Sequence, residues 1–327
     1  MPHPAIRLIA VDLDGTLLSH EGRVGPANRA ALLAAERAGI TVVIATGRRH
    51  TYALNVLHDL GLSPDTILIS SNGAVVRTFR SALLERTLMD PAAARWLCAH
   101  LGEFRNALVI TFDKTLSTGE DARGSLVVEE LADLHNSISR WMIANEPYLL
   151  RVEPIEDSLH GEAPIQMMLC GTVARMRAAE ALMLQHPGVA PVGDPRATGT
   201  ISLNRTEYPE RDLSIVDILP AGCSKGAAIL RLAASRGIIE GEIMAIGDNW
   251  NDLSMLEIAA LPVLMGNAPA DLLAMAEERQ WLISAAHHAD GVAEAIATVL
   301  PEIASEPAPG TIERESQAGP ELVGLKR

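Results

Sequence analysis

The first third of the chain alternates between short apolar runs and longer segments of mixed polarity. The runs at 6–14, 40–47 and 66–74 are rich in Val, Ile and Leu and predict buried strands. The segments 25–39 and 49–61 have the apolar spacing of helices, and each ends in Gly. Strands that alternate with helices predict a parallel sheet with right-handed crossovers, and near-continuous apolar strands predict helices on both faces.

This alternation breaks down between about residue 74 and residue 218. A short hairpin is expected at 74–79 and 82–89, and the helices that follow are irregularly placed. We expect helices near 91–101, 131–145 and 173–186, and strands near 107–113, 124–130, 148–154, 164–171, 200–206 and 213–218. This order is typical of an α+β domain inserted into the first one.

The regular pattern returns after Pro220. We expect helices at 224–237, 251–259, 268–278 and 291–300, and strands at 242–248, 261–268 and 281–284. The predicted fold class is therefore α/β, a Rossmann-like doubly wound parallel sheet core with an inserted α+β cap domain. We expect the core at 1–88 and 216–301, the cap at 89–215, and a disordered tail rich in Pro, Glu and Gly at 302–327.

Composition narrows the classes of partner. The 327 residues carry a formal net charge of −14, which argues against nucleic acid or an anionic membrane as the main partner. A small anionic substrate stays compatible, because a metal ion or a local basic residue can reverse the field inside a pocket. Nothing in the pattern bears on oligomeric state.

The cysteines and the first residues indicate a compartment. Cys98, Cys170 and Cys223 lie far apart, without metal-ligand spacing or a disulfide framework, which suits a reducing compartment. The N-terminal stretch has no long apolar segment before the first aspartates, and no apolar run reaches about 18 residues, as a membrane-spanning helix would. We therefore expect a cytoplasmic protein.

Carboxylates follow two of the predicted core strands. Asp12 and Asp14 end the first strand, Asp248 ends a strand near the C-terminus, and Asp252 comes four residues later. The carboxyl ends of parallel strands share one edge of a sheet, where ligands bind. Unit charges about 4 Å apart repel by about 4 kcal/mol at an effective dielectric near 20. Oxygen ligands of this kind suit Mg²⁺, which would remove that cost.

A magnesium ion among acids suggests a phosphorylated substrate. One aspartate could attack phosphorus and form an aspartyl phosphate, while its neighbour supplies and later removes a proton. The two aspartates at the end of the first strand have the spacing for this division of labour.

Five short motifs together resemble those of a known family. They are DLDGTL (12–17), ATGR (45–48), SNGA (71–74), SKG (224–226) and GDNWND (247–252). In this order, and with a large insertion after the third strand, they are similar to the haloacid dehalogenase-like (HAD) phosphatases of the Cof-type branch, which carry a C2 cap. The resemblance spans residues 6 to 300 and implies a phosphoric monoester hydrolase that acts on a small phosphorylated metabolite, either a sugar phosphate or a phosphorylated cofactor.

The resemblance implies four catalytic residues. Asp12 would be the nucleophile and a metal ligand, and Asp14 the general acid and base, with its backbone carbonyl on the metal. Thr46 would donate a hydrogen bond to the transferring phosphoryl group, and Lys225 would offset the charge on its oxygens and on Asp12.

Asp248 would be the second side-chain ligand of Mg²⁺, the one cofactor that the resemblance implies. Asn251 and Asp252 would position the metal waters and the lysine. The residues that the resemblance places at the phosphate or substrate are Gly47, Arg48, Asn72, Gly73, Asn251, Asp252 and Asn267.

Each of these residues also has an ordinary structural interpretation. Asp14 with Gly15 could be a turn, Asn72 with Gly73 a hairpin turn, and Lys225 and Arg48 solvated surface residues. His287 and His288 are a pair in an expected loop, and two adjacent histidines without a third ligand give little reason to expect a metal site.

The motifs leave two functional questions open. A phosphomutase would use the same nucleophile, and a non-enzymatic relative would keep the fold, although here every catalytic position is filled. Substrate identity depends on the cap, where the polar candidates that we cannot rank are Asp113, Lys114, Glu129, Asn204 and Arg205.

Overall fold

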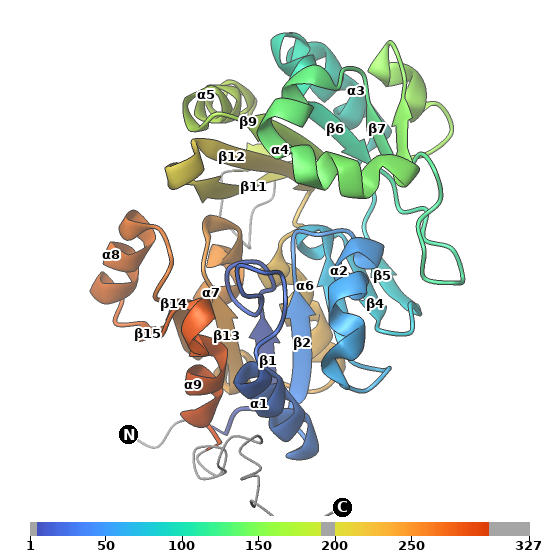
Figure 1. Ribbon diagram of the computed structural model, residues 1–327. Coiled ribbons are helices and arrows are strands. Elements are labelled where there is room, and N and C mark those ends of the chain that lie inside the picture. The colour runs from blue at the N-terminus through green and yellow to red at the C-terminus, as the bar shows by residue number, and fades with distance from the viewer. Residues whose placement is uncertain (1–4, 191–199, 301–327) are drawn as a thin grey trace, which may run out of the picture.

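The computed structural model describes residues 5–190 and 200–300, which form two units stacked one above the other (Figure 1). The lower unit, the core, contains an eight-stranded sheet in the order β15-β14-β13-β1-β2-β3-β4-β5. The strands from β15 to β3 run parallel, and β4 and β5 form an antiparallel hairpin at one edge. The strands are β1 (Leu8–Val11), β2 (Thr41–Ala45), β3 (Ile67–Ser70), β4 (Val75–Thr78), β5 (Leu83–Arg86), β13 (Ile243–Gly247), β14 (Leu261–Met265) and β15 (Leu282–Ser284).

Helices cover both faces of this sheet, as the apolar strands predicted. In β1, Ile9 and Val11 pack with α1 (Pro26–Arg37), α2 (His50–Leu57) and α9 (Gly291–Ala297). The alternate residues Leu8 and Ala10 pack with the helices of the other face, which are α6 (Lys225–Ser235), α7 (Leu253–Glu257) and α8 (Ala270–Glu278). Because successive side chains point to opposite faces, a strand that is apolar throughout must be covered on both sides. The predicted doubly wound core is confirmed.

The upper unit, the cap, is built on a seven-stranded, mostly antiparallel sheet in the order β10-β11-β12-β9-β6-β7-β8. Its helices α3 (Pro91–His100) and α5 (Val173–Met183) pack on one face, and α4 (Ala132–Asn145) packs on the other. The strands are β6 (Leu108–Thr111), β7 (Leu126–Val128), β8 (Leu149–Arg151), β9 (Gln166–Gly171), β10 (Val189–Ala190), β11 (Ile201–Tyr208) and β12 (Leu213–Pro220). The face that carries α4 looks toward the core (Figure 1), so this face can contribute to a site between the units.

The chain crosses between the two units twice. The first crossing lies between β5 and α3. The second differs from our expectation, because the boundary drawn at 215/216 falls inside β12, which pairs along its length with β11 and from Ser214 to Ile218 with β9. The strand continues because its apolar residues Val216, Ile218 and Leu219 are needed in the interior, so the return to the core follows Pro220.

The helices and strands of the core and cap lie close to the predicted segments. Strand β10 is a short strand that we did not predict. Within residues 5–190 and 200–300, none of the helices combines the length and the apolar character that crossing a bilayer requires. The tail predicted at 302–327 lies outside the described residues.

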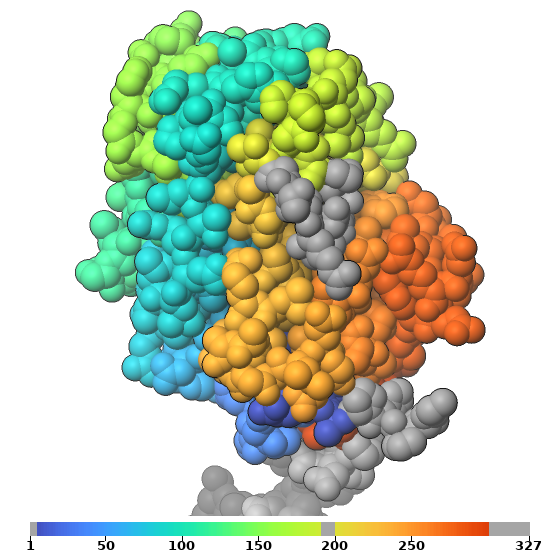
Figure 2. Space-filling model, turned by 180° about the vertical axis from the view of Figure 1, so that it is seen from behind, coloured from blue at the N-terminus to red at the C-terminus, as the bar shows by residue number. Residues whose placement is uncertain are grey.

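Seen from behind, the cap sits directly on the core (Figure 2).

Candidate active site

Two buried carboxylates meet at the edge of the core sheet that faces the cap. Asp12 follows β1 and Asp248 follows β13, and these strands are parallel neighbours, with Val11 opposite Ile246. Both side chains are almost completely buried. With Asp252 they form a cluster in which one oxygen of each carboxylate lies within 4.8 Å of the others. The structure thus brings together the acidic residues that the sequence placed at opposite ends of the chain.

Lys225 is the cation of this cluster and is fully buried. It opens helix α6 directly after Ser224, the N-cap residue, whose Oγ accepts a hydrogen bond from the backbone of Ala227. Its Nζ lies 2.5 Å from Asp12 Oδ1 and 2.6 Å from Asp252 Oδ1. Burial lowers the pKa of Lys225, but the two carboxylates outweigh it and hold the pKa above its ordinary value. A solvated lysine is therefore excluded.

Asp252 positions this lysine. Its Oδ1 accepts from Lys225, and its Oδ2 accepts from the backbone N–H groups of Asp248 and Asn249, at 3.0 Å each. Asp252 therefore serves to hold the lysine and the backbone turn after Asp248 in place. The two other carboxylates of the cluster, those of Asp12 and Asp248, are the candidate metal ligands.

The cluster carries more buried negative charge than the lysine neutralises. Burial and the repulsion from Asp252 raise the pKa of Asp12 to about 7, although Lys225 acts in the opposite direction. Burial and the repulsion from Asp12 and Asp252 raise the pKa of Asp248 well above its ordinary value. A cation between these carboxylates would relieve both costs, and hard oxygen donors are the ligands that Mg²⁺ prefers. The residues present therefore fit a magnesium ion.

The loop after β1 wraps around Asp248. Thr16 donates from Oγ1 to Asp248 Oδ1 over 3.0 Å. Asn267 donates from Nδ2 to the carbonyl oxygen of Gly15 over 2.8 Å, and it lies 3.4 Å from Asp248 Oδ2. Gly15 has a φ of +79°, and a Cβ at this position would lie 2.3 Å from Asp248 Oδ2. Only glycine combines this backbone conformation with such a close approach.

Replacing Gly15 with Ala is therefore expected to displace Asp248 and to lower Mg²⁺-dependent turnover at least about tenfold, since even partners outside a metal's ligand set are worth about 10–100-fold. Gly22→Ala is the matched control, because Gly22 has a similar φ of +72° and no atom within 4 Å of the added Cβ. Both variants should lose about 1–2 kcal/mol of stability from the left-handed backbone. Thermal denaturation and turnover separate the two effects, and equal losses of turnover would contradict the steric explanation.

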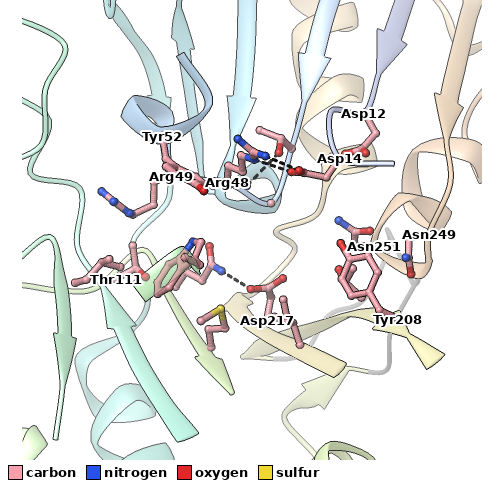
Figure 3. A pocket seen from close by; sticks show the side chains of 18 residues that line it. Asp12, Asp14, Arg48, Arg49, Tyr52, Thr111, Tyr208, Asp217, Asn249 and Asn251 are labelled. Atoms are coloured by element: carbon pink, nitrogen blue, oxygen red, sulfur yellow. Dashed lines mark hydrogen bonds and ion pairs between the residues drawn. The ribbon is translucent and has the colours of Figure 1, made fainter. Parts of the chain in front are cut away.

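Asp14 and Thr46 lie on the open side of the cluster. The Asp14 side chain is 41% exposed, and its two oxygens accept hydrogen bonds from Arg48 Nε at 2.7 Å and from Arg48 Nη2 at 2.5 Å (Figure 3). Thr46 follows β2 and accepts from the backbone N–H of Arg48. Arg48 is thus tied to the site, and the surface interpretation of this residue is wrong.

Asn72 belongs to the site and to a turn at the same time. It lies in the connection between the antiparallel strands β3 and β4, with a φ of 50°, and it is completely buried. Its Oδ1 accepts from Asn251 Nδ2 at 3.3 Å, and its Nδ2 donates to Asp217 Oδ2 of the cap at 2.6 Å. Gly73 allows this turn to pack closely, because a Cβ there would lie 2.2 Å from the carbonyl oxygen of Ser224.

A cavity of about 250 Å³ lies between this edge of the core and the cap (Figure 3). Of the predicted site residues, six line it, namely Asp12, Asp14, Thr46, Gly47, Arg48 and Asn251. The other predicted residues stand outside its lining: Lys225, Asp248, Asp252, Asn72, Gly73 and Asn267. Several of them contact the lining directly: Lys225 donates to Asp12, and Asn72 donates to Asp217.

The cap contributes residues to the cavity that we did not predict. The cap residues of the lining are Thr111, Leu126, Trp141, Gln166, Met168, Thr206, Tyr208, Ile215 and Asp217, and the core adds Arg49, Tyr52 and Asn249. None of the five cap residues that we considered from the sequence lines it; Asp113, for example, pairs with Arg77 and Arg86. The sequence did contain an indication of one of them, because Asp217 interrupts the apolar run of β12.

Asp217 points from the cap into the cavity, opposite the aspartates of the core (Figure 3). It accepts hydrogen bonds from the side-chain amides of Asn72 and Gln166. Burial raises the pKa of Asp217 to about 7, although those hydrogen bonds and Lys225 lower it. The bond to Asn72 also joins the cap to the core.

The raised pKa gives Asp217 a predictable effect on stability. Between about pH 4 and pH 7 the unfolded chain releases this proton while the folded chain keeps it, so its contribution to stability is lost as the pH rises. Asp217→Asn removes this loss, because Gln166 can turn its side-chain oxygen toward the new NH₂ group while Asn72 still donates to the amide oxygen. We expect the advantage of the variant in the free energy of unfolding to grow across this window, to at most about 4 kcal/mol. Denaturant unfolding at several pH values measures it, and parallel curves would contradict the assignment.

Tyr208 faces the core carboxylates from the end of β11 (Figure 3). Burial raises the pKa of its phenol, and the nearby charges of Asp14, Asp248 and Asp12 raise it further. The phenol therefore stays protonated at neutral pH and offers a hydrogen-bond donor to an anionic group in the cavity.

The chain is similar in sequence and in fold to known proteins. A family model described as haloacid dehalogenase-like hydrolase matches residues 9–296. The chain is 28% identical over 306 residues to the 5-amino-6-(5-phospho-D-ribitylamino)uracil phosphatase YwtE of Bacillus subtilis (strain 168), covering 90% of this chain and 98% of that protein. It is 30% identical over 286 residues to the phosphatase YwpJ of the same organism, covering 83% and 93%. A solved haloacid dehalogenase-like hydrolase from B. subtilis superposes with a TM-score of 0.70 at 24% identity, covering 89% and 99%, which shows a common fold.

Proposed function

Because the chain belongs to the haloacid dehalogenase-like hydrolases, we propose that it is a Mg²⁺-dependent phosphatase that hydrolyses a small phosphorylated metabolite through an aspartyl phosphate on Asp12. The observation that carries this proposal is the position of Asp12, which borders the cavity and contacts a buried lysine. A cavity of about 250 Å³ suits a small molecule.

In the first step, an oxygen of Asp12 attacks phosphorus, and a new oxygen–phosphorus bond forms while the ester bond breaks. Asp14 gives its proton to the leaving alcohol oxygen. In the second step, Asp14 takes a proton from water as the water oxygen attacks phosphorus, which releases phosphate and restores the Asp12 carboxylate. Lys225 offsets the negative charge on Asp12 and on the phosphoryl oxygens.

The magnesium ion would be held by the carboxylates of Asp12 and Asp248 and by the backbone carbonyl of Asp14. When bound, it would neutralise charge on the phosphoryl oxygens. The charge imbalance of the cluster supports this assignment, because burial and repulsion raise the pKa of Asp12 to about 7 and a cation favours its ionised, nucleophilic form.

Arg48 couples substrate binding to the acid. It occupies both oxygens of Asp14, so Asp14 cannot face a leaving group while this ion pair holds. A phosphoryl group that enters beside Arg48 offers the guanidinium a second anion. The pair then loosens, and Asp14 becomes available for proton transfer.

The cap side of the cavity favours a substrate with a flat ring. Trp141, Met168 and Ile215 supply an apolar surface, and Gln166 and Asp217 place polar groups beside it. Such a wall suits a heterocycle whose edge forms hydrogen bonds. YwtE, to which the chain is similar, is named for a phosphorylated uracil derivative. We therefore favour a phosphorylated cofactor or a precursor of one over a simple sugar phosphate.

A hydrolysis screen tests the proposal. Phosphorylated metabolites with and without a heterocycle are incubated with the full chain, in Mg²⁺ or in a chelator, and both free phosphate and isomerised products are measured. We expect phosphate release that depends on Mg²⁺ and is fastest for heterocyclic substrates. Isomerised product without phosphate release would point to a phosphomutase instead.

Trp141→Ala tests the substrate class in the same screen. We expect it to lower kcat/KM about fivefold for heterocyclic substrates and little for glycerol phosphate, since an aromatic contact contributes about 1 kcal/mol. Trp96→Ala is the control, because Trp96 packs against the apolar residues on the opposite face of the cap sheet. An equal loss for both substrates would contradict the role of Trp141.

A further inference from the structure

Three histidines from distant parts of the chain meet at one place outside the cavity. His20 lies in the loop after β1, and His287 and His288 lie in the short turn of helix (His287–Ala289) that precedes α9. The ring centroids of His20 and His287 are 4.3 Å apart, and those of His287 and His288 are 5.4 Å apart. One ring nitrogen from each of the three lies within 4.8 Å of the others. The structure thus supplies the third ligand that the sequence pair lacked.

His287 lies at the centre of this cluster and is only 9% exposed. Its Nε2 lies 3.4 Å from His20 Nδ1, and its Nδ1 is buried without a hydrogen-bond partner among the described residues. A buried nitrogen without a partner costs about 1–3 kcal/mol. Neither nitrogen is bonded to a backbone group of the described residues, and Nε2 faces His20, where both rings can bind one ligand.

The protonation of His287 suits a metal ion. Burial lowers the pKa of His287, and the neighbouring rings of His20 and His288 lower it further. The neutral imidazole is the form that binds metal ions. Within residues 5–190 and 200–300, no carboxylate forms an ion pair with any of the three rings.

We propose that His20, His287 and His288 bind a transition-metal ion of the Zn²⁺ class, with a fourth position open to water. In a tetrahedral zinc site the Zn–N bonds of about 2.0–2.1 Å place the ligand nitrogens about 3.3 Å apart. The separation of 3.4 Å between His20 Nδ1 and His287 Nε2 is close to this value. Imidazole nitrogens select zinc-like ions, whereas the carboxylates of the core cluster select magnesium.

One side chain connects this histidine cluster to the acidic cluster. The backbone N–H of His287 donates to Asn267 Oδ1 over 2.8 Å. The Nδ2 of the same amide donates to the carbonyl of Gly15 and lies near Asp248 Oδ2. A metal ion that holds His287 in place therefore also holds Asn267 against the loop around Asp248.

Calorimetric titration of the full chain with Zn²⁺, in excess Mg²⁺, tests the proposal. The Asp248→Asn variant is titrated in parallel, because it removes a ligand of the acidic cluster and leaves the histidines intact. We expect one zinc ion per chain in both proteins. His20→Gln and His288→Gln should weaken binding about 100-fold or more, since even the loss of a partner outside a ligand set costs about 10–100-fold.

His58→Gln is the matched control, because His58 is exposed on a different part of the surface, and it should bind zinc like the unchanged chain. Co²⁺ provides a second readout through the visible absorption of a tetrahedral site, which His20→Gln should abolish. Zinc binding that is lost in Asp248→Asn, or that survives in both His20→Gln and His288→Gln, would overturn the proposal. Because phosphatase activity is not measured, this result is independent of the proposed function.

Discussion

Asp12→Asn is expected to abolish Mg²⁺-dependent release of phosphate and to leave the fold intact. The variant replaces the attacking oxygen with an amide that is a far weaker nucleophile, and we expect turnover to fall at least about 1,000-fold, as it does when other enzymes lose a nucleophile. Asn has the size of Asp and still accepts from Lys225. It also removes the buried charge of Asp12, whose pKa burial and the repulsion from Asp252 raise to about 7, so folding loses little.

Phosphate release from an aryl phosphate and circular dichroism measure the two parts of this expectation. Asp59→Asn makes the same chemical change at a side chain that is 89% exposed and should retain full turnover. If Asp12→Asn kept a substantial part of the activity, the reaction could not proceed through an aspartyl phosphate at this residue.

Lys225→Met is expected to reduce both activity and stability. It removes the charge that offsets Asp12 during the reaction, and it leaves Asp12 and Asp252 buried without their cation. Loss of one partner from a buried ion pair costs about 3–5 kcal/mol. The cost should be smaller at low pH, because the two carboxylates can then take up protons and lose their charge, and it should grow as the pH rises.

Denaturant unfolding at several pH values measures this loss. Lys114→Met is the control, because Lys114 is partly exposed and pairs with the exposed Glu162. The double variant Lys225→Met with Asp252→Asn should recover part of the stability, since one of the uncompensated charges is gone, but none of the activity. A Lys225→Met protein as stable as the unchanged chain would show that the buried charges are compensated by other groups.

The core could be read from the sequence because its signals are local. The continuous apolar run of β1 and the helical spacing that follows it determine the strands, the helices and the covered faces. Asp12 and Asp248 could be paired without a structure, because the ends of parallel strands must share one edge of the sheet. At that same edge, only the structure shows that Asn267 donates to the carbonyl of Gly15 and that Arg48 pairs with Asp14.

The cap residues that line the cavity could not be predicted in this way. Gln166 and Asp217 lie on different strands, and only the pairing of β9 with β12 and the seating of the cap on the core direct both toward one cavity. The boundary at 215/216 was placed too early for the same reason, since the pairing partners of β12 decide where that strand ends.

By itself, the sequence determined the doubly wound core, the presence of an inserted cap and the set of carboxylates and lysine at one sheet edge. The tertiary structure alone decided which cap side chains line the cavity and that His20 lies beside His287 and His288. The physical reason is the separation along the chain of the residues that decide each feature. Periodicity and strand ends are encoded by neighbouring residues. A contact between distant segments depends on the packing of every element between them.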